Sequence, residues 1–188
     1  MKSCFLFFGL VISLAGFSQS KFLPEIKNGT SMAYLANVNG QDIPVGFKVD
    51  SMAAEFLRII WSVEGYGEGT WIMNKKSLQS ATGTLGDNPQ PGVEVVLPDD
   101  KIQLLLSRDQ FSMLTKDKKV KHNDIEYNVV PASAGTEFKL ADKAVDVVYL
   151  ESADKSSKIW VLNNAAFPLL VKVIGNVNGP DLTLLTLQ

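Results

Sequence analysis

The segment KIWVLNNAAFPLLVKVIGN, residues 158–176, is the part of this sequence that says most about the fold. Lys158 to Leu162 and Leu169 to Ile174 each have the length and the β-branched content of a strand. Residues 163–168 supply a turn, and Pro168, which has no amide hydrogen, suits the start of the second strand. The segment therefore predicts a tight hairpin.

Both faces of this predicted hairpin are apolar. Successive side chains of a strand point to opposite faces, and an apolar face must be buried. Strict alternation places Ile159, Val161, Leu169, Val171 and Val173 on one face, and Trp160, Leu162, Leu170 and Ile174 on a second, surplus apolar face. Something must cover that second face: a helix, another sheet, a partner or a ligand.

Elsewhere the dominant period is two, with apolar and polar residues alternating in residues 32–38 and 43–49. Asn39-Gly40 lies between these segments and is typical of a two-residue hairpin, because both residues tolerate positive φ. We expect an all-β, mainly antiparallel protein of about ten strands, in a curled sheet or incomplete barrel with one or two short helices. A β-sandwich is the alternative.

Short helices are predicted at two places. Ser107 can cap a helix from Arg108 to about Lys116, and residues 75–81 can form one helical turn. Residues 101–107 (KIQLLLS) read as a strand, and a further hairpin is predicted to turn near His122 to Asp124. A helix could pack on one face of the doubly apolar strands, which favours the curled sheet.

The N-terminus has the layout of a secretory signal peptide. Lys2 precedes an apolar run from Cys4 to Ala15, which is far shorter than the ~20 residues of a membrane-spanning helix. We expect residues 1–18 to be the signal peptide and residues 19–188 to form a single β domain; cleavage after Ser20 and an uncleaved anchor are the alternatives. The mature chain would have no transmembrane span and would be periplasmic or extracellular.

The cysteine content limits the chemistry. The single cysteine, Cys4, lies inside the apolar run, so it is badly placed for lipidation and the protein is not expected to be a lipoprotein. Without it the mature chain can form no disulfide and no thiolate metal site. The formal net charge is −2, and no basic stripe interleaves with aromatic residues, so nucleic-acid binding is not expected.

No catalytic constellation is recognisable. The one histidine, His122, lies in a predicted polar turn, where we expect it to be solvated. Because the mature chain would have one histidine and no cysteine, it can form neither a Cys–His pair nor a two-histidine metal site. We therefore expect no cofactor, no metal and no enzymatic activity. Paired carboxylates remain as a third hypothesis, a hydrolase, for which the candidates are Glu64, Glu68, Asp99 and Asp100.

Several motifs suggest a family. The sequences VVLPDDKIQLLLSRDQFSML and IWVLNNAAFPLL, after an exported start and a first hairpin, resemble a group of uncharacterised exported β-proteins of Gram-negative envelopes. These are distantly similar to unclosed-barrel periplasmic domains of the Lol type, the lipoprotein carriers and receptors. The resemblance implies a fold and a compartment, and the Lol comparison implies a cavity for acyl chains; it implies no catalytic residue.

Together these observations predict an exported, non-enzymatic β-protein that binds an apolar or amphiphilic ligand, such as a lipid, in the concavity of a curled sheet. Strand tryptophans and the phenylalanine of the 163–168 turn are the candidate contacts, because small-molecule sites are mostly apolar and aromatic. The candidate ligand-binding residues are Trp61, Trp71, Trp160 and Phe167. The alternative is a structural or protein-interaction module of the cell envelope, whose surplus face is covered by its own helix or by another protein.

Overall fold

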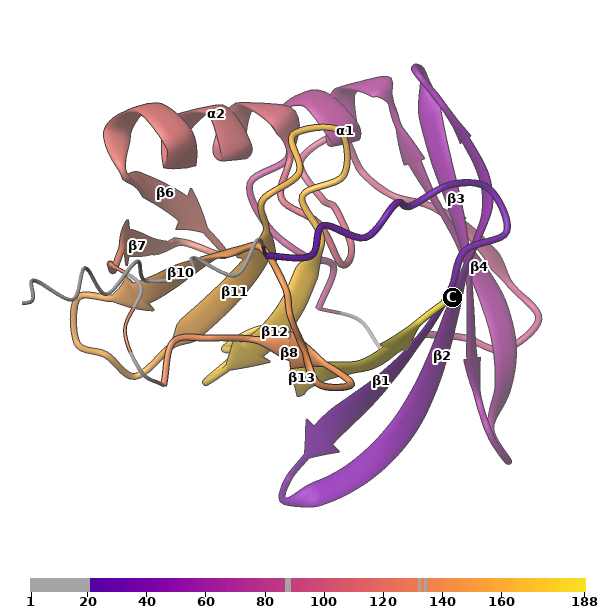
Figure 1. Ribbon diagram of the computed structural model, residues 1–188. Coiled ribbons are helices and arrows are strands. Elements are labelled where there is room, and N and C mark those ends of the chain that lie inside the picture. Colours follow the sequence, from indigo (N-terminus) through magenta and orange to yellow (C-terminus); the bar gives the residue numbers. More distant parts are fainter. Residues whose placement is uncertain (1–20, 87–88, 132, 134) are drawn as a thin grey trace, which may run out of the picture.

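The computed structural model describes residues 21–188 except 87, 88, 132 and 134, and these form one large sheet with two short helices (Figure 1). The sheet has 11 strands in the order β5-β4-β3-β2-β1-β13-β12-β11-β10-β7-β6. The strands are β1 (Ser31–Val38), β2 (Gln41–Ala53), β3 (Phe56–Val63), β4 (Gly67–Asn74), β5 (Glu94–Val96), β6 (Lys119–His122), β7 (Ile125–Val129), β10 (Val147–Ser152), β11 (Lys158–Leu162), β12 (Leu170–Ile174) and β13 (Asp181–Leu187). The helices are α1 (Lys75–Ser80) and α2 (Arg108–Asp117), and β8 (Lys139–Leu140) pairs with β9 (Lys143–Ala144) separately.

Neighbouring strands of the sheet are antiparallel except for β4 and β5, which are parallel. The sheet does not close, and β5 and β6 are its two edges. The prediction of a mainly antiparallel, unclosed sheet with short helices is confirmed. Figure 1 shows β1–β4 as a wall on the right and β10–β12 on the left, with α2 above the latter.

Strand β1 joins the two halves of the sheet. It pairs with β2 on one side and with β13, the last strand of the chain, on the other, so that Met32 lies opposite both Phe47 and Leu187. The Tyr34 hydroxyl donates a hydrogen bond of 2.9 Å to the carbonyl oxygen of Leu170 in β12, inside the core. Residues far apart in sequence thus meet around one strand.

Two of the predicted hairpins form with the expected turns. Asn39 and Gly40, between β1 and β2, have φ of 53° and 83°. Asn123 and Asp124, between β6 and β7, have φ of 51° and 64°. Two consecutive residues at positive φ make a turn whose twist matches that of the flanking strands, and Asn, Asp and Gly accept this conformation most readily.

One apolar face of β10–β12 is covered by α2. The helix begins at a capping box: the Ser107 hydroxyl accepts from the Gln110 amide, and the Gln110 side chain accepts from the Ser107 amide. The buried helix residues Phe111 and Leu114 form one hydrophobic cluster with Leu150, Ile159, Val161, Leu170 and Val173 of the strands. The predicted helix and its cap are therefore confirmed.

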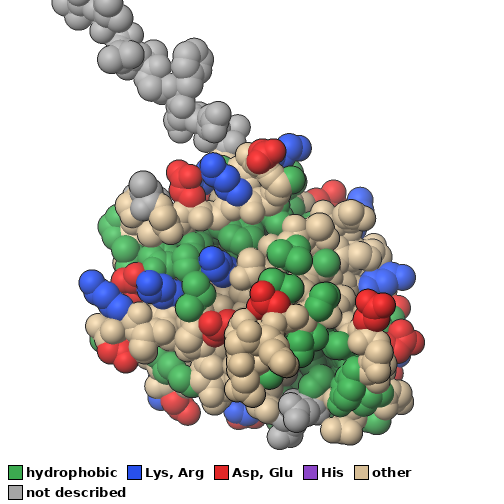
Figure 2. Space-filling model, turned by 90° about the horizontal axis from the view of Figure 1, so that it is seen from below, with side chains coloured by type: hydrophobic (Ala, Val, Ile, Leu, Met, Phe, Trp, Pro, Cys, Tyr) green, Lys and Arg blue, Asp and Glu red, His purple; other side chains and the backbone are tan. Residues whose placement is uncertain are grey.

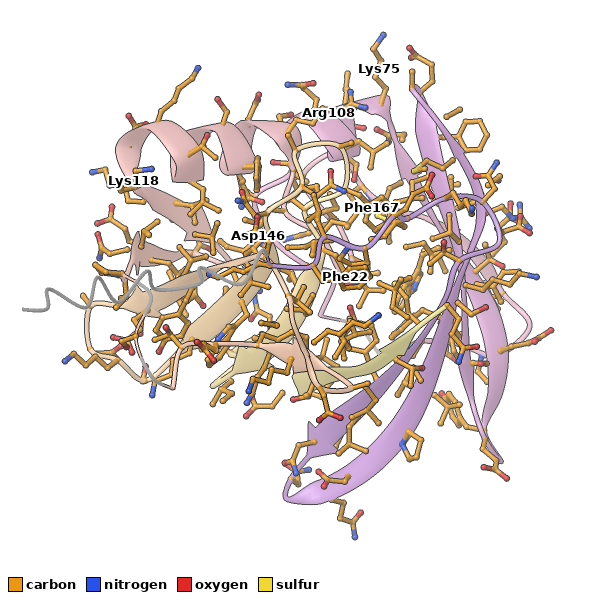
Figure 3. The ribbon with its side chains drawn as sticks, in the orientation of Figure 1. Phe22, Lys75, Arg108, Lys118, Asp146 and Phe167 are labelled. Carbon is orange, nitrogen blue, oxygen red and sulfur yellow. The ribbon has the colours of Figure 1, made fainter. Side chains whose placement is uncertain are left out.

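The opposite face is covered by the segment that contains β8 and β9. Trp160 lies on this face beside Tyr149, with ring centroids 4.6 Å apart, and its Nε1 donates to the carbonyl oxygen of Thr136. Phe138 and Val145 of the covering segment are buried in the same cluster. The N-terminal segment adds to it, since Phe22 bonds to the backbone on either side of Val145; Figure 3 labels Phe22 and Asp146.

The strict alternation expected for this hairpin is wrong at three residues: Leu169 and Val171 cluster with Trp160, and Leu170 clusters with the α2 residues. A β-bulge between Trp160 and Val161 places Leu170 opposite Val161, while Val173 lies opposite Ile159. A bulge sets two residues of one strand against one of its partner and so changes which face the following side chain occupies. Leu170 therefore belongs to the α2 side of the sheet and not to the Trp160 side.

Residues 101–107 were expected to form a strand, and this is also wrong. The segment makes only isolated bridges, Lys101 to Gly83 and Leu105 to Leu169. Every side chain from Ile102 to Leu106 is buried, with Leu104 at φ 63°. A strand would send alternate side chains to opposite faces, whereas a chain that threads the interior buries them all.

The covering role of α2 can be tested by shortening one buried side chain. We expect Leu114→Ala, at a position 1% exposed, to lower the free energy of unfolding by roughly 3 kcal/mol, because it removes buried methyl groups and leaves a cavity. The adjacent control, Met113→Ala at a position 41% exposed, should change it by less than about 0.5 kcal/mol. Urea denaturation followed by circular dichroism measures both; equal effects would contradict the assignment of the helix face.

Candidate functional site

A cavity of about 520 Å³ lies inside the curl of the sheet, between β1–β4 and the β11–β13 strands. This volume falls within the roughly 300–1,000 Å³ of small-molecule sites. The apolar lining residues are Ala36, Val38, Ile43, Val45, Phe47, Trp61, Val63, Tyr66, Trp71, Leu85, Pro89, Leu104, Tyr127, Ile159, Leu170, Val173, Pro180 and Leu182. The cavity is on the same side of the sheet as α2, since Ile159, Leu170 and Val173 also pack with that helix.

One wall of the cavity is aromatic. Trp61 and Trp71, from β3 and β4, have ring centroids 6.3 Å apart, and Phe47 of β2 stacks on Trp71 at 5.9 Å. Gly69, which pairs with Trp61, is required for this arrangement: a Cβ at residue 69 would lie 2.7 Å from Trp61 Cζ2. The Trp61 ring thus lies across Gly69, and together with Trp71 and Phe47 it forms one apolar wall.

The mouth of the cavity lies among three turns at one end of the strands. Antiparallel pairing brings the β1–β2, β3–β4 and β12–β13 turns to this end, which Figure 2 views from below. Val38 and Tyr66 line the cavity and are 40% and 50% exposed, and the β12–β13 turn contributes Asn176 and Asn178 to the lining. Figure 2 shows hydrophobic side chains on this face in more than one area. The lining at this end is therefore apolar on the β1–β4 side and carries amide groups on the β12–β13 side.

The polar lining is sparse and uncharged. No aspartate, glutamate, lysine or arginine lines the cavity within the described part of the chain. Asn123 is held by Thr84, whose amide donates to Asn123 Oδ1 over 2.7 Å, and Gln103 Nε2 donates to the carbonyl oxygen of Leu85. The remaining polar side chains are His122, Asn176 and Asn178. Such a surface accommodates apolar and neutral groups better than ions, because a buried charge without a partner is costly.

His122 was expected to be solvated, and this is wrong. It is the last residue of β6, it is 2% exposed, and it lines the cavity. The turn itself is made by the next two residues, so His122 points inward in the strand alternation. Burial, and secondarily the positive charge of Lys101, lowers the pKa of His122 to about 4. The imidazole is therefore neutral at neutral pH.

Of the four predicted ligand-binding residues, two line the cavity and two lie elsewhere. Trp61 and Trp71 line the cavity together. Trp160 lies on the other face of the sheet, beneath the β8–β9 segment, with Lys172 Nζ 5.1 Å from its ring centroid. Phe167, labelled in Figure 3, is buried beside a separate cavity of about 40 Å³ near the start of α2.

The four candidate carboxylates form two separate pairs. Asp99 accepts from Asn74 at the end of β4 and pairs with Lys76, and Asp100 pairs with Lys101. Glu68 lies near the start of β4, opposite Ser62, and Glu64 follows β3. Six residues of extended strand separate Glu68 from Asn74, which is about 20 Å at ~3.3 Å per residue. The two pairs therefore face no common cleft.

The described residues hold no group of three or more histidine, cysteine, aspartate or glutamate side chains that could bind a metal ion. None of their helices is long and apolar enough to cross a membrane. No protein-family model, no curated protein sequence and no solved structure matches this chain at a significant level. The structure thus defines a large, mostly antiparallel β-sheet protein with an apolar cavity.

Two parts of this site were missed from sequence. Phe47 alternates with Val45 and Val49 and gives no sign of lining a cavity instead of filling a core. His122 shares its face of β6 with the buried Val120. Alternation of apolar and polar residues over 119–122 would have predicted that His122 points inward. The contacts between these residues join strands distant in sequence, and no local pattern records them.

The burial of His122 makes stability depend on pH. An unfolded chain takes up a proton on His122 below about pH 6.5, but the folded chain does so only near pH 4. The neutral, buried His122 therefore contributes its full share to the free energy of unfolding above about pH 6.5. This share declines as the pH falls toward 4, because the unfolded chain alone takes up the proton. We expect wild type to lose about 2–3 kcal/mol more stability than His122→Gln between about pH 7 and pH 4.5, measured by urea denaturation. Parallel pH profiles for the two proteins would contradict this assignment.

Proposed function

We propose that this protein binds an apolar or amphiphilic small molecule in the cavity inside the curled sheet. The observation that carries the proposal is the cavity itself: about 520 Å³ of space lined by aromatic and aliphatic side chains, with no charged side chain among the described residues of its lining. Protein interiors are normally close-packed, so a void of this size next to a well-packed core favours an occupant.

The energetics support an apolar occupant. Burial of apolar surface contributes about 25 cal/mol per Å², so an aliphatic chain seated against Trp61, Trp71 and Phe47 gains affinity without any ion pair. Val38 and Tyr66, which line the cavity and are partly exposed, offer such a molecule apolar contacts on the way from the surface. A lipid-like ligand fits both features.

The covering of the C-terminal hairpin bears on the alternative function. The surplus apolar face was the reason to consider a structural or interaction module of the envelope. That face is covered by the chain's own β8–β9 segment, and the other face by α2, so neither requires a partner protein. The separation of the carboxylate pairs likewise favours a binding protein over a hydrolase.

The cellular setting remains part of the proposal. Residues 1–18, the expected signal peptide, lie outside the described residues, and the export of the protein to the periplasm or exterior rests on their sequence. The resemblance to Lol-type domains favours an envelope role and a lipid-like ligand. A carrier or receptor for such a ligand would use a cavity of the kind described here.

The binding function can be tested with a variant that fills the cavity. Ala36 lines it from β1, whereas Ala33 is on the opposite face of the same strand. We expect Ala36→Phe to weaken binding of the neutral apolar dye phenylnaphthylamine at least tenfold, because the ring occupies the ligand's space, and Ala33→Phe to leave it unchanged. Dye fluorescence measures binding, and circular dichroism establishes that both variants fold.

The same experiment has a native counterpart. Protein purified from its own host should release an apolar or amphiphilic molecule into organic solvent, detected by mass spectrometry, and the Ala36→Phe protein should release less of it. Empty extracts, together with equal dye binding by both variants, would contradict the proposed function.

Export predicts a defined mature terminus. Cleavage after Ser18 should produce a chain that begins at Gln19, because Gly16 and Ser18 then occupy the small-residue positions. Intact-mass measurement of the protein from its native host checks this, and replacing Gly16 by a bulky residue, Gly16→Trp, should leave the precursor uncleaved. A full-length chain recovered from the cytosol would contradict export.

A further inference from the structure

We propose that His122 is the polar anchor of the cavity: its Nε2–H donates a hydrogen bond to an uncharged oxygen, a hydroxyl or carbonyl, at the head of an otherwise apolar ligand. This inference rests on the proposed binding function and specifies the chemical class of ligand. It is carried by one chain of hydrogen bonds that begins at the N-terminus of α2.

The capping box of α2 determines how the Gln110 amide is oriented. Gln110 Oε1 accepts from the backbone amide of Ser107 over 3.1 Å, while the Gln110 backbone amide donates to Ser107 Oγ. An amide oxygen can only accept and an amide nitrogen can only donate, so this contact identifies which end of the side chain is which. The NH₂ end of Gln110, which is itself 1% exposed, therefore points away from the cap.

The Gln110 amide nitrogen in turn determines the tautomer of His122. Gln110 Nε2 lies 2.7 Å from the carbonyl oxygen of Lys121, 3.3 Å from that of Thr82 and 3.2 Å from His122 Nδ1. The NH₂ group has two hydrogens for these three neighbours and cannot itself accept, so a proton on Nδ1 would face a donor; the contact therefore fits the neutral tautomer whose proton is on Nε2. The cap of a helix thus makes Nε2 a hydrogen-bond donor.

That donor, His122 Nε2, has no hydrogen-bond partner among the residues that the structure describes, although the residue is buried. Among the described residues, Arg58 Nε is the only fully buried side-chain nitrogen or oxygen without a hydrogen bond. It lies 3.1 Å from the Asp50 carboxylate, with which it forms an ion pair. His122 Nε2 is not such a fully buried atom, so it keeps some accessible surface, and the residue lines the cavity. A buried donor of this kind is normally satisfied by a ligand or water.

The lining decides which acceptor suits this donor. A carboxylate or phosphate head would enter a cavity whose described lining has no cationic side chain, and its charge would be buried without a partner. A hydroxyl or carbonyl oxygen accepts the same hydrogen bond without that penalty. The Gln103 amide, also on the wall and 9% exposed, adds a second neutral polar group for the head. A long-chain alcohol has the required combination of groups.

The test compares dodecanol with dodecane, which lacks only the oxygen. His122→Leu should weaken dodecanol binding about three- to tenfold, as expected for one neutral hydrogen bond, and leave dodecane binding unchanged or tighter. The Gln110 amide nitrogen is not left unpaired in this variant, because the carbonyl oxygens of Thr82 and Lys121 still accept from it. Tryptophan fluorescence reports occupancy, since Trp61 and Trp71 line the cavity.

A second readout needs no variant. His122 is the single histidine of the chain, so a nitrogen spectrum of histidine-labelled wild type reports on this ring alone. Dodecanol should shift the Nε2 signal, and dodecane should not. If both probes bind but neither shifts the signal nor responds to His122→Leu, the anchor is overturned and the cavity function stands. If neither probe binds wild type, the proposed function fails, and the anchor with it.

Discussion

The pairing of β1 with both β2 and β13 is the constraint on which the remaining architecture depends. This strand brings residues 31–38 against the last strand of the chain, and the buried bond from the Tyr34 hydroxyl to the Leu170 carbonyl ties it to β12 as well. Closing so long a loop costs chain entropy, which burial of apolar side chains on the inner face of the sheet must offset. The cavity lies between the two halves that β1 joins, so the site exists only when this pairing is made.

The C-terminal hairpin is the most deeply buried part of the sheet because the chain covers it twice. Helix α2 packs on one face, and the β8–β9 segment with the N-terminal residues packs on the other. The double cover includes the part of β12 that borders the cavity, Leu170 and Val173. In contrast, β2, β3 and β4 line the cavity with Phe47, Trp61 and Trp71. Part of the remaining wall, Ile159, Leu170 and Val173, also belongs to the α2 cluster.

The helix cap and the cavity are linked through one side chain. Gln110 completes the capping box of α2 with its oxygen and contacts His122 with its nitrogen, so the residue that starts the helix also orients the imidazole. This couples a local stability element to the chemistry of the site. A cavity with an oriented imidazole and no charged side chain in its described lining is compatible with the proposed binding function.

The sequence by itself determined most of the strands, the hairpins at Asn39-Gly40 and near Asn123, and the α2 helix with its Ser107 cap, because these depend on alternation, turn residues and capping within a few positions. It also showed that 158–174 needed cover on two faces. Only the tertiary structure decided what provides that cover, that a bulge moves Leu170 to the α2 side, and that residues 101–107 thread the interior. It alone brought Trp61, Trp71 and His122 to one cavity while it separated Trp160 and Phe167 from them, because such contacts arise between segments that are distant along the chain.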